Sequence, residues 1–116
     1  MSPSSPPPPI AVRRALRQLG TDIRHARLRR RLPQDVVADR ALTSRQTVAR
    51  MEKGDWRVAI GTWASVLFAL GLLDGLAGLA SPETDPVGRA LESEQLPERA
   101  RLPRSHDPAK EARSDG

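Results

Sequence analysis

The 116-residue sequence contains no cysteine, no tyrosine, one phenylalanine and two tryptophans. The absence of cysteine excludes disulfides, iron–sulfur clusters and zinc sites with thiolate ligands. The two histidines, His25 and His106, are far apart in the sequence, and neither has a partner at the spacing of a metal site. The sequence therefore predicts a protein that works without a metal or another cofactor.

Long apolar runs are also missing. The most apolar segment, residues 63–80, contains Asp74 and three glycines, whereas a membrane-spanning helix needs about 20 apolar residues with few charges. This segment therefore predicts buried helices. The amino terminus is rich in serine and proline and lacks the basic and apolar regions of a signal peptide. The protein is expected in the cytoplasm, associated with the nucleoid.

Catalytic patterns are lacking as well. The sequence shows no nucleophile with a matching base, no pair of carboxylates at a catalytic spacing and no phosphate-binding glycine loop. An enzyme is therefore not expected.

Basic residues are abundant, with 19 Lys and Arg against 14 Asp and Glu and an isoelectric point near 11.2. Residues 1–80 hold 13 basic and 6 acidic side chains, whereas residues 81–116 hold 6 basic and 8 acidic ones. A basic body with a mildly acidic tail suggests that the body binds a polyanion. The charge alone is equally compatible with a role in solubility.

Proline-rich segments mark the two ends of the predicted domain. Residues 1–10 include four consecutive prolines, which favour an extended, solvated chain and predict a disordered leader. Residues 81–116 contain five prolines, many charges and few large apolar side chains, so most of this tail is predicted to be disordered. A brief helix over residues 87–96 could form on docking. Residues 11–80 remain as one small domain.

Apolar residues at steps of three and four predict a first helix from Ile10 to about Arg30. Gly20 is expected to weaken or split this helix, with Thr21 capping a second start. The apolar stripe consists of Val12, Leu16, Leu19, Ile23 and Ala26. The other faces carry seven arginines that meet either phosphate or water, namely Arg13, Arg14, Arg17, Arg24, Arg27, Arg29 and Arg30.

Two short helices are predicted next, over residues 32–42 and 43–54. Pro33 suits the first turn of a helix, where its missing N–H is no loss. Ser44 is a natural N-cap of the second helix, and Gly54 is a natural terminator. The inward faces consist of Val36, Val37 and Ala41 in the first helix and of Val48 and Met51 in the second. Two short helices joined by about four residues are typical of a helix-turn-helix.

The apolar segment then predicts a fourth helix over residues 61–72 and a short fifth helix that Pro82 closes. The buried stripe of the fourth helix consists of Trp63, Val66, Leu67 and Leu70. The predicted fold is therefore all-α, with four to five helices in a helix-turn-helix domain.

The segment LPQDVVADRALTSRQTVARMEKG, residues 32–54, resembles the helix-turn-helix of the phage-repressor-like XRE family. The matching positions are Gln34, Ala38, Ser44, Arg45, Thr47, Val48, Met51, Glu52 and Gly54. Pro33 replaces the usual Thr, and Leu42 replaces the usual glycine of the turn. Because a side chain at positive φ costs about 1 kcal/mol, the turn is expected to be either strained or differently shaped.

The flanking segments resemble the HipB-like antitoxin branch of that family, over about residues 19–88. The alanine–leucine–glycine-rich helix, the short leucine helix and the sequence SPETDPVG at residues 81–88 carry this resemblance. It implies an antitoxin that represses its own operon and neutralises a HipA-like serine/threonine kinase.

The second helix of such a motif lies in the major groove, with its first residues over the base edges. Arg45 and Gln46 are therefore the predicted base readers, because Arg pairs bidentately with guanine and Gln with adenine. Thr47 could touch a thymine methyl or a phosphate. The other predicted backbone contacts are Ser44, Arg50, Lys53 and, by resemblance to the family, Gln34.

One such domain contacts too few bases for tight binding, so a homodimer on a two-part operator is expected. The apolar segment 63–79 exceeds what a small bundle needs internally, and it is the predicted two-fold interface. Two other functions remain open at this point. One is a stand-alone repressor without a toxin partner, and the other is an accessory scaffold whose basic surface is incidental.

Overall fold

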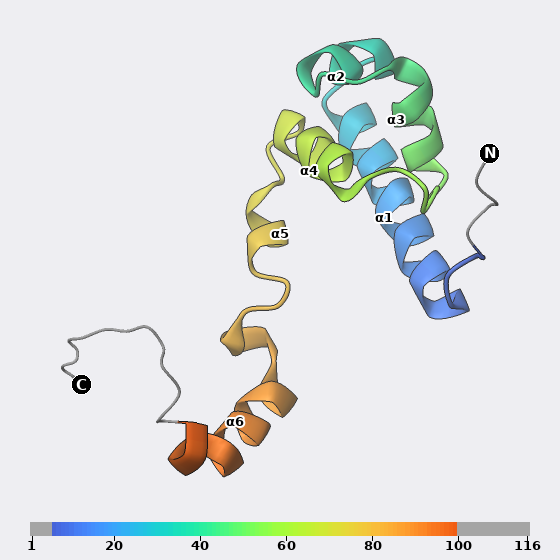
Figure 1. Ribbon diagram of the computed structural model, residues 1–116. Helices are drawn as coiled ribbons and strands as arrows, with labels where there is room; N and C mark the ends of the chain where they lie inside the picture. Colours follow the sequence, from blue (N-terminus) through green and yellow to red (C-terminus); the bar gives the residue numbers. More distant parts are fainter. Residues whose placement is uncertain (1–5, 100–116) are drawn as a thin grey trace. The chain divides into compact units, whose positions relative to one another are not determined.

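The computed structural model describes residues 6–99, and the side chains of residues 6–95. Its elements are α1 (Ile10–Arg29), α2 (Gln34–Arg40), α3 (Arg45–Glu52), α4 (Ile60–Ala69), α5 (Asp74–Ala77), the 3-10 helix η1 (Pro82–Thr84) and α6 (Pro86–Arg99) (Figure 1). Within the described range all elements are helical, which confirms the predicted all-α class. The predictions for residues 1–5 and 100–116 lie outside this range. The chain divides into two compact units, and the boundary in the sequence falls between Ala77 and Gly78.

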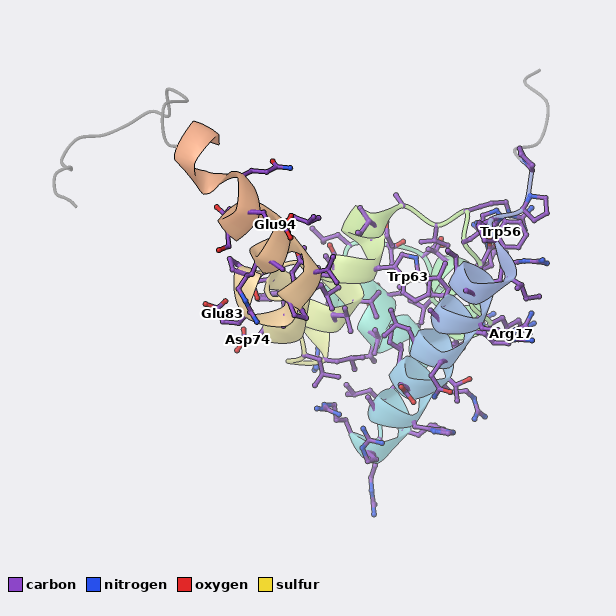
Figure 2. The ribbon with its side chains drawn as sticks, turned by 90° about the horizontal axis from the view of Figure 1, so that it is seen from below. Arg17, Trp56, Trp63, Asp74, Glu83 and Glu94 are labelled. Atoms are coloured by element: carbon purple, nitrogen blue, oxygen red, sulfur yellow. The ribbon has the colours of Figure 1, made fainter. Side chains whose placement is uncertain are left out.

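The first unit is built around one apolar core that α1, α2, α3 and α4 share. Helix α3 packs against both α1 and α2, and α2 also packs against α4 (Figure 1). Trp63 of α4 is 5% exposed and points into the interior between α4 and α1 (Figure 2). The fully buried side chains at the centre are Ile23, Val37, Val48, Met51 and Val66. The inward faces predicted from periodicity therefore meet one another.

Helix α1 runs for 20 residues without interruption, so the predicted break at Gly20 is wrong. Gly20 is buried, and a Cβ at this position would lie 2.3 Å from the carbonyl oxygen of Met51. The missing side chain lets α1 approach the backbone of α3 directly. Glycine is needed here for the packing of two helices, and that packing outweighs its low helix propensity.

The predicted stripe of α1 is confirmed except at its beginning. Ile23 and Ala26 are each 1% exposed, and Leu16 and Leu19 pack against the core from partly buried positions. Val12 is 43% exposed, because the core along α1 begins only at Leu16.

Helices α1 to α4 all end in the same way. The residue after each C-cap has a positive φ, and the next N–H donates back to a carbonyl in the last helical turn, which is the Schellman motif. The residues at positive φ are Arg31 (55°), Leu42 (59°), Gly54 (80°) and Gly71 (77°). The returning hydrogen bonds run from Leu32 to Arg27, Thr43 to Ala38, Asp55 to Arg50 and Leu72 to Leu67. The terminator predicted at Gly54 is confirmed.

Leu42 occupies the turn between α2 and α3 in the left-handed conformation that favours glycine. The turn therefore keeps the backbone conformation that a glycine would give it, and Leu42 is held in a strained left-handed conformation. Its side chain is 93% exposed, so burial provides no compensation within this unit.

The second unit consists of η1 and α6, which pack against each other. Asp85 precedes α6, and its Oδ1 accepts a hydrogen bond of 2.9 Å from the backbone N–H of Gly88. Helix α6 spans the segment in which a brief helix was predicted. No helix in the range 6–99 has the length and apolar character needed to cross a membrane.

We predict that Leu42→Gly raises the free energy of unfolding by up to about 1 kcal/mol. Relief of the left-handed strain is worth about 1–2 kcal/mol, and the greater freedom of glycine in the unfolded chain offsets part of it. Urea unfolding followed by tryptophan fluorescence measures the change. Leu42→Ala is the matched control, because it keeps the Cβ and the strain. Equal stabilities of the two variants would contradict a strained turn.

Candidate nucleic-acid interface

Helix α3 presents one charged and polar face to the solvent. Arg45, Gln46, Arg50 and Lys53, the last being the C-cap residue, are exposed, whereas Val48, Met51 and Glu52 are buried on the other side. At 1.5 Å per residue, the eight residues of α3 extend about 12 Å, which is about the width of the major groove. The exposed face thus has the length and the chemistry that a groove-reading helix needs.

The N-terminus of α3 is capped as predicted. The Oγ of Ser44 accepts a hydrogen bond of 3.1 Å from the backbone N–H of Thr47 and donates one of 2.9 Å to the Thr47 Oγ1. The hydroxyl of Thr47 accepts that bond, so its own proton remains available to a further acceptor. The cap fixes the first turn of α3, from which Arg45 and Gln46 extend into the solvent.

Gln34 is the first residue of α2 and is half-buried. Its Nε2 donates a hydrogen bond of 3.0 Å to the Oε1 of Glu52. This bond orients the amide between α2 and α3. The phosphate contact expected of Gln34 remains a prediction, now with one amide proton already committed inside the protein.

Glu52 forms a buried ion pair with Arg27, although Arg27 was predicted to lie on an outer face of the first helix. The Arg27 Nε lies 2.6 Å from the Glu52 Oε2 and its Nη2 lies 3.1 Å from the Oε1, while Nη1 donates to the Leu32 carbonyl at 3.0 Å. The two side chains are only 10% and 4% exposed. The expectation that Arg27 meets phosphate or water is therefore wrong.

A signal for this pair was present in the spacing. Arg27 follows Ile23 by four residues, so it continues the buried stripe of α1 rather than the exposed face. Its partner stands 25 residues further along the chain, on a different helix, and periodicity alone does not identify such a partner.

Asp55, which follows α3, forms ion pairs with two arginines. Its carboxylate accepts hydrogen bonds from the backbone N–H and the Nε of Arg57, at 2.9 and 3.0 Å, and from the Nε of Arg50, at 2.9 Å. The bonds from Arg57 and then Arg50 hold the pKa of the Asp55 carboxyl well below its usual range. The hydrogen bond to Asp55, with the negative charge of that carboxylate, likewise raises the pKa of the Arg57 guanidinium.

Because the pKa of Asp55 is lowered in the folded protein, its ion pairs are complete at neutral pH. Their contribution to stability disappears only as the pH falls below the usual range of an aspartate. Arg50, a predicted phosphate contact, is thus held in place through its Nε, and its terminal nitrogens form no ion pair within residues 6–95.

In the part of the chain that the structure describes, no three His, Cys, Asp or Glu side chains gather as metal ligands would. The arrangement that is present is a short capped helix with a polar outer face, held by a second short helix across a tight turn. This arrangement defines a helix-turn-helix DNA-binding domain.

A comparison with protein families supports this class directly. The family model described as "Helix-turn-helix domain" matches residues 5–78, and the chain belongs to this XRE-like family. Searches of curated proteins and of solved structures gave no significant match. Domains of this kind bind DNA and typically have no enzymatic activity.

We predict that Glu52→Ala lowers the free energy of unfolding by about 3–5 kcal/mol, because it leaves the charge of Arg27 buried without a partner. Replacement of the pair by Arg27→Met and Glu52→Leu together should recover most of this loss. Urea unfolding monitored by circular dichroism tests both variants. Arg24→Ala, which removes an exposed arginine without an ion pair within residues 6–95, is the control and should leave the midpoint nearly unchanged. A double variant as unstable as Glu52→Ala would contradict the assignment.

Proposed function

We propose that this protein is a sequence-specific transcriptional repressor that acts as the antitoxin of a HipBA-like pair. It represses its own operon and neutralises a HipA-like serine/threonine kinase. The DNA-binding part rests on the capped helix α3, whose exposed face carries Arg45, Gln46, Arg50 and Lys53. The antitoxin part rests on the resemblance of residues 19–88 to the HipB-like branch, which ends in SPETDPVG.

In the proposed complex Arg45 and Gln46 read the bases. They occupy the first two positions of α3, where a groove-bound helix comes closest to the base edges. Both side chains are exposed, and none of their polar atoms appears in a hydrogen bond among the described residues. They are therefore available for the bidentate contacts that Arg makes to guanine and Gln to adenine.

The backbone contacts surround these two residues. Ser44 and Thr47 stand at the first turn of α3, Gln34 stands at the first residue of α2, and backbone N–H groups at helix N-termini favour phosphate. Arg50 and Lys53 lie at the opposite end of the exposed face. In the proposed complex the base readers stand at the N-terminal end of α3, and two cations that contact phosphate stand at its C-terminal end.

We further propose that two copies bind the operator as a homodimer. Apolar side chains remain exposed at and after α4, with Ile60 73%, Phe68 67% and Leu72 42% exposed. These residues lie in or beside the segment that the sequence analysis assigned to a two-fold interface. Burying them against a second copy would remove apolar surface from water and double the number of bases read.

We predict that Arg45→Ala with Gln46→Ala weakens binding to the preferred sequence at least about 30-fold. Two bidentate contacts are each worth about 1–3 kcal/mol. The preferred sequence is first selected from random duplexes with the wild-type protein, and fluorescence anisotropy then gives the affinity. Binding to unrelated DNA should change little, and two chains should bind per operator. The control is Arg14→Ala with Gln18→Ala, an exposed pair of the same types on α1. Unchanged operator preference in the α3 variant would refute the proposed reading.

The antitoxin role has its own test, in which tagged protein is recovered from its native cell with and without nuclease. We expect a kinase-sized protein to remain bound after nuclease treatment. The purified partner should phosphorylate protein substrates, and this activity should fall as the antitoxin is added at equimolar amounts. Operator binding with no such partner would leave a stand-alone repressor. A protein that binds neither operator nor kinase would be a scaffold.

A further inference from the structure

A basic cleft of about 270 Å³ lies between the first half of α1 and the loop after α3. It extends beyond the helix-turn-helix motif, whose helix α3 supplies only part of its lining. Its lining includes five cationic side chains from three stretches of the chain, namely Arg13 and Arg17 of α1, Arg50 and Lys53 at the end of α3, and Arg57 of the loop. The mutual repulsion of these like charges is relieved when an anion binds among them.

The charge of the cleft is only partly compensated within the protein. Asp55 is the single acidic residue among its lining residues, and both of its oxygens already bind Arg50 and Arg57. Arg13, Arg17 and Lys53 form no ion pair within residues 6–95. The Nε of Arg13 donates to the carbonyl of Pro8 at 3.2 Å, which leaves its charge unneutralised. The cleft thus retains a clear excess of positive charge.

The walls of the cleft are held close together by backbone packing. A Cβ on Gly54 would lie 2.6 Å from the Cα of Arg17, so the loop rests directly on α1 at this point. The guanidinium of Arg57 lies 5.6 Å from the centroid of the Trp56 ring, which holds it beside Asp55. Figure 2 shows Arg17 and Trp56 on the same side of α1. Arg13, Arg50 and Arg57 are therefore held by hydrogen bonds before any ligand arrives, and the backbone that carries Arg17 is packed against the loop.

The cleft continues the face of α3 that carries the predicted base readers. Gln46, Arg50 and Lys53 follow one another at steps of four and three residues, so they lie along one side of the helix. With the first turn of α3 over the base edges, its far end, about 12 Å away at 1.5 Å per residue, lies nearer to the edge of the groove. The edge of the groove is where the phosphates of the DNA backbone stand.

We propose that this cleft binds a backbone phosphate of the same duplex that α3 reads, with Arg17 and Arg13 of α1 completing the site. The inference rests on the proposed DNA-binding function and extends its footprint beyond the helix-turn-helix motif. It also separates the arginines of α1 by role. Arg13 and Arg17 contact DNA, whereas Arg24 and Arg29 lie outside the cleft and remain in water.

The test is the salt dependence of DNA binding by Arg17→Ala, with Arg24→Ala as the matched control. Both arginines are exposed on α1, and circular dichroism verifies that both variants fold. Affinities for the operator and for unrelated DNA are measured from 50 to 200 mM salt. We expect Arg17→Ala to reduce the slope of log K against log salt by about 0.9, the value for one phosphate. The reduction should be the same on both DNAs, and Arg24→Ala should leave the slope unchanged.

Equal slopes for the Arg17 and Arg24 variants would overturn the inference. With operator preference still dependent on Arg45 and Gln46, that result would leave the proposed function intact. The opposite result is also possible to recognise. A reduced slope in Arg17→Ala would support the phosphate site in the cleft. Operator preference that is unchanged in the Arg45→Ala, Gln46→Ala variant would at the same time refute these two residues as base readers. Absence of any DNA binding would refute both.

A phosphate group could also come from a small molecule, and a second arm addresses that source. Pyrophosphate is titrated into the DNA-free protein while tryptophan fluorescence is recorded, because Trp56 lines the cleft and is 37% exposed. We expect no saturable change below 1 mM. A fluorescence change that saturates at a lower pyrophosphate concentration, and that Arg17→Ala abolishes, would assign the cleft to a free phosphorylated ligand. That result would overturn its assignment to the duplex.

Discussion

The arrangement of the DNA-binding unit depends on one buried carboxylate. Glu52 accepts hydrogen bonds from Arg27 of α1 and Gln34 of α2, while it belongs itself to the last turn of α3. Removing these charges from water costs nearly as much as their attraction returns, so the network adds little net stability. Its geometry favours this arrangement of the three helices, since separating the partners inside the protein would leave a buried charge unpaired. We infer that the pair sets how α3 is presented rather than whether the chain folds.

That constraint matters because the two motif helices are too short to be stable alone. Helices α2 and α3 have seven and eight residues, well below the length at which an isolated helix persists in water. The Ser44 side chain caps the start of α3, and Schellman turns close the C-terminal ends of α2 and α3. The turn at Leu42 shows how strongly the packing of α2 and α3 determines the backbone between them, because it keeps a leucine at positive φ against the preference of that residue.

Local patterns in the sequence predicted the features that depend on neighbouring residues. The periodicity of apolar residues identified the helices and most of the core, and Ser44 and Gly54 marked the two ends of α3. The failures at Gly20 and Arg27 share a cause, because each residue is explained by a group on another helix. Gly20 makes room for the Met51 carbonyl, and Arg27 pairs with Glu52. The cleft was missed for the same reason, since its cations come from separate stretches of the chain.

The arginines of α1 show why a count of charges says little about function. Arg17, Gly20 and Arg27 lie on one side of the helix, three and seven residues apart, and all three adjoin the C-terminal end of α3. At the buried end of this strip the guanidinium of Arg27 is paired with Glu52, whereas at the exposed end that of Arg17 has no acidic partner within residues 6–95. The same contact between two helices therefore orients α3 at one point and leaves a free cation beside it at another. Position along that contact, rather than residue type, decides which arginine can meet a phosphate.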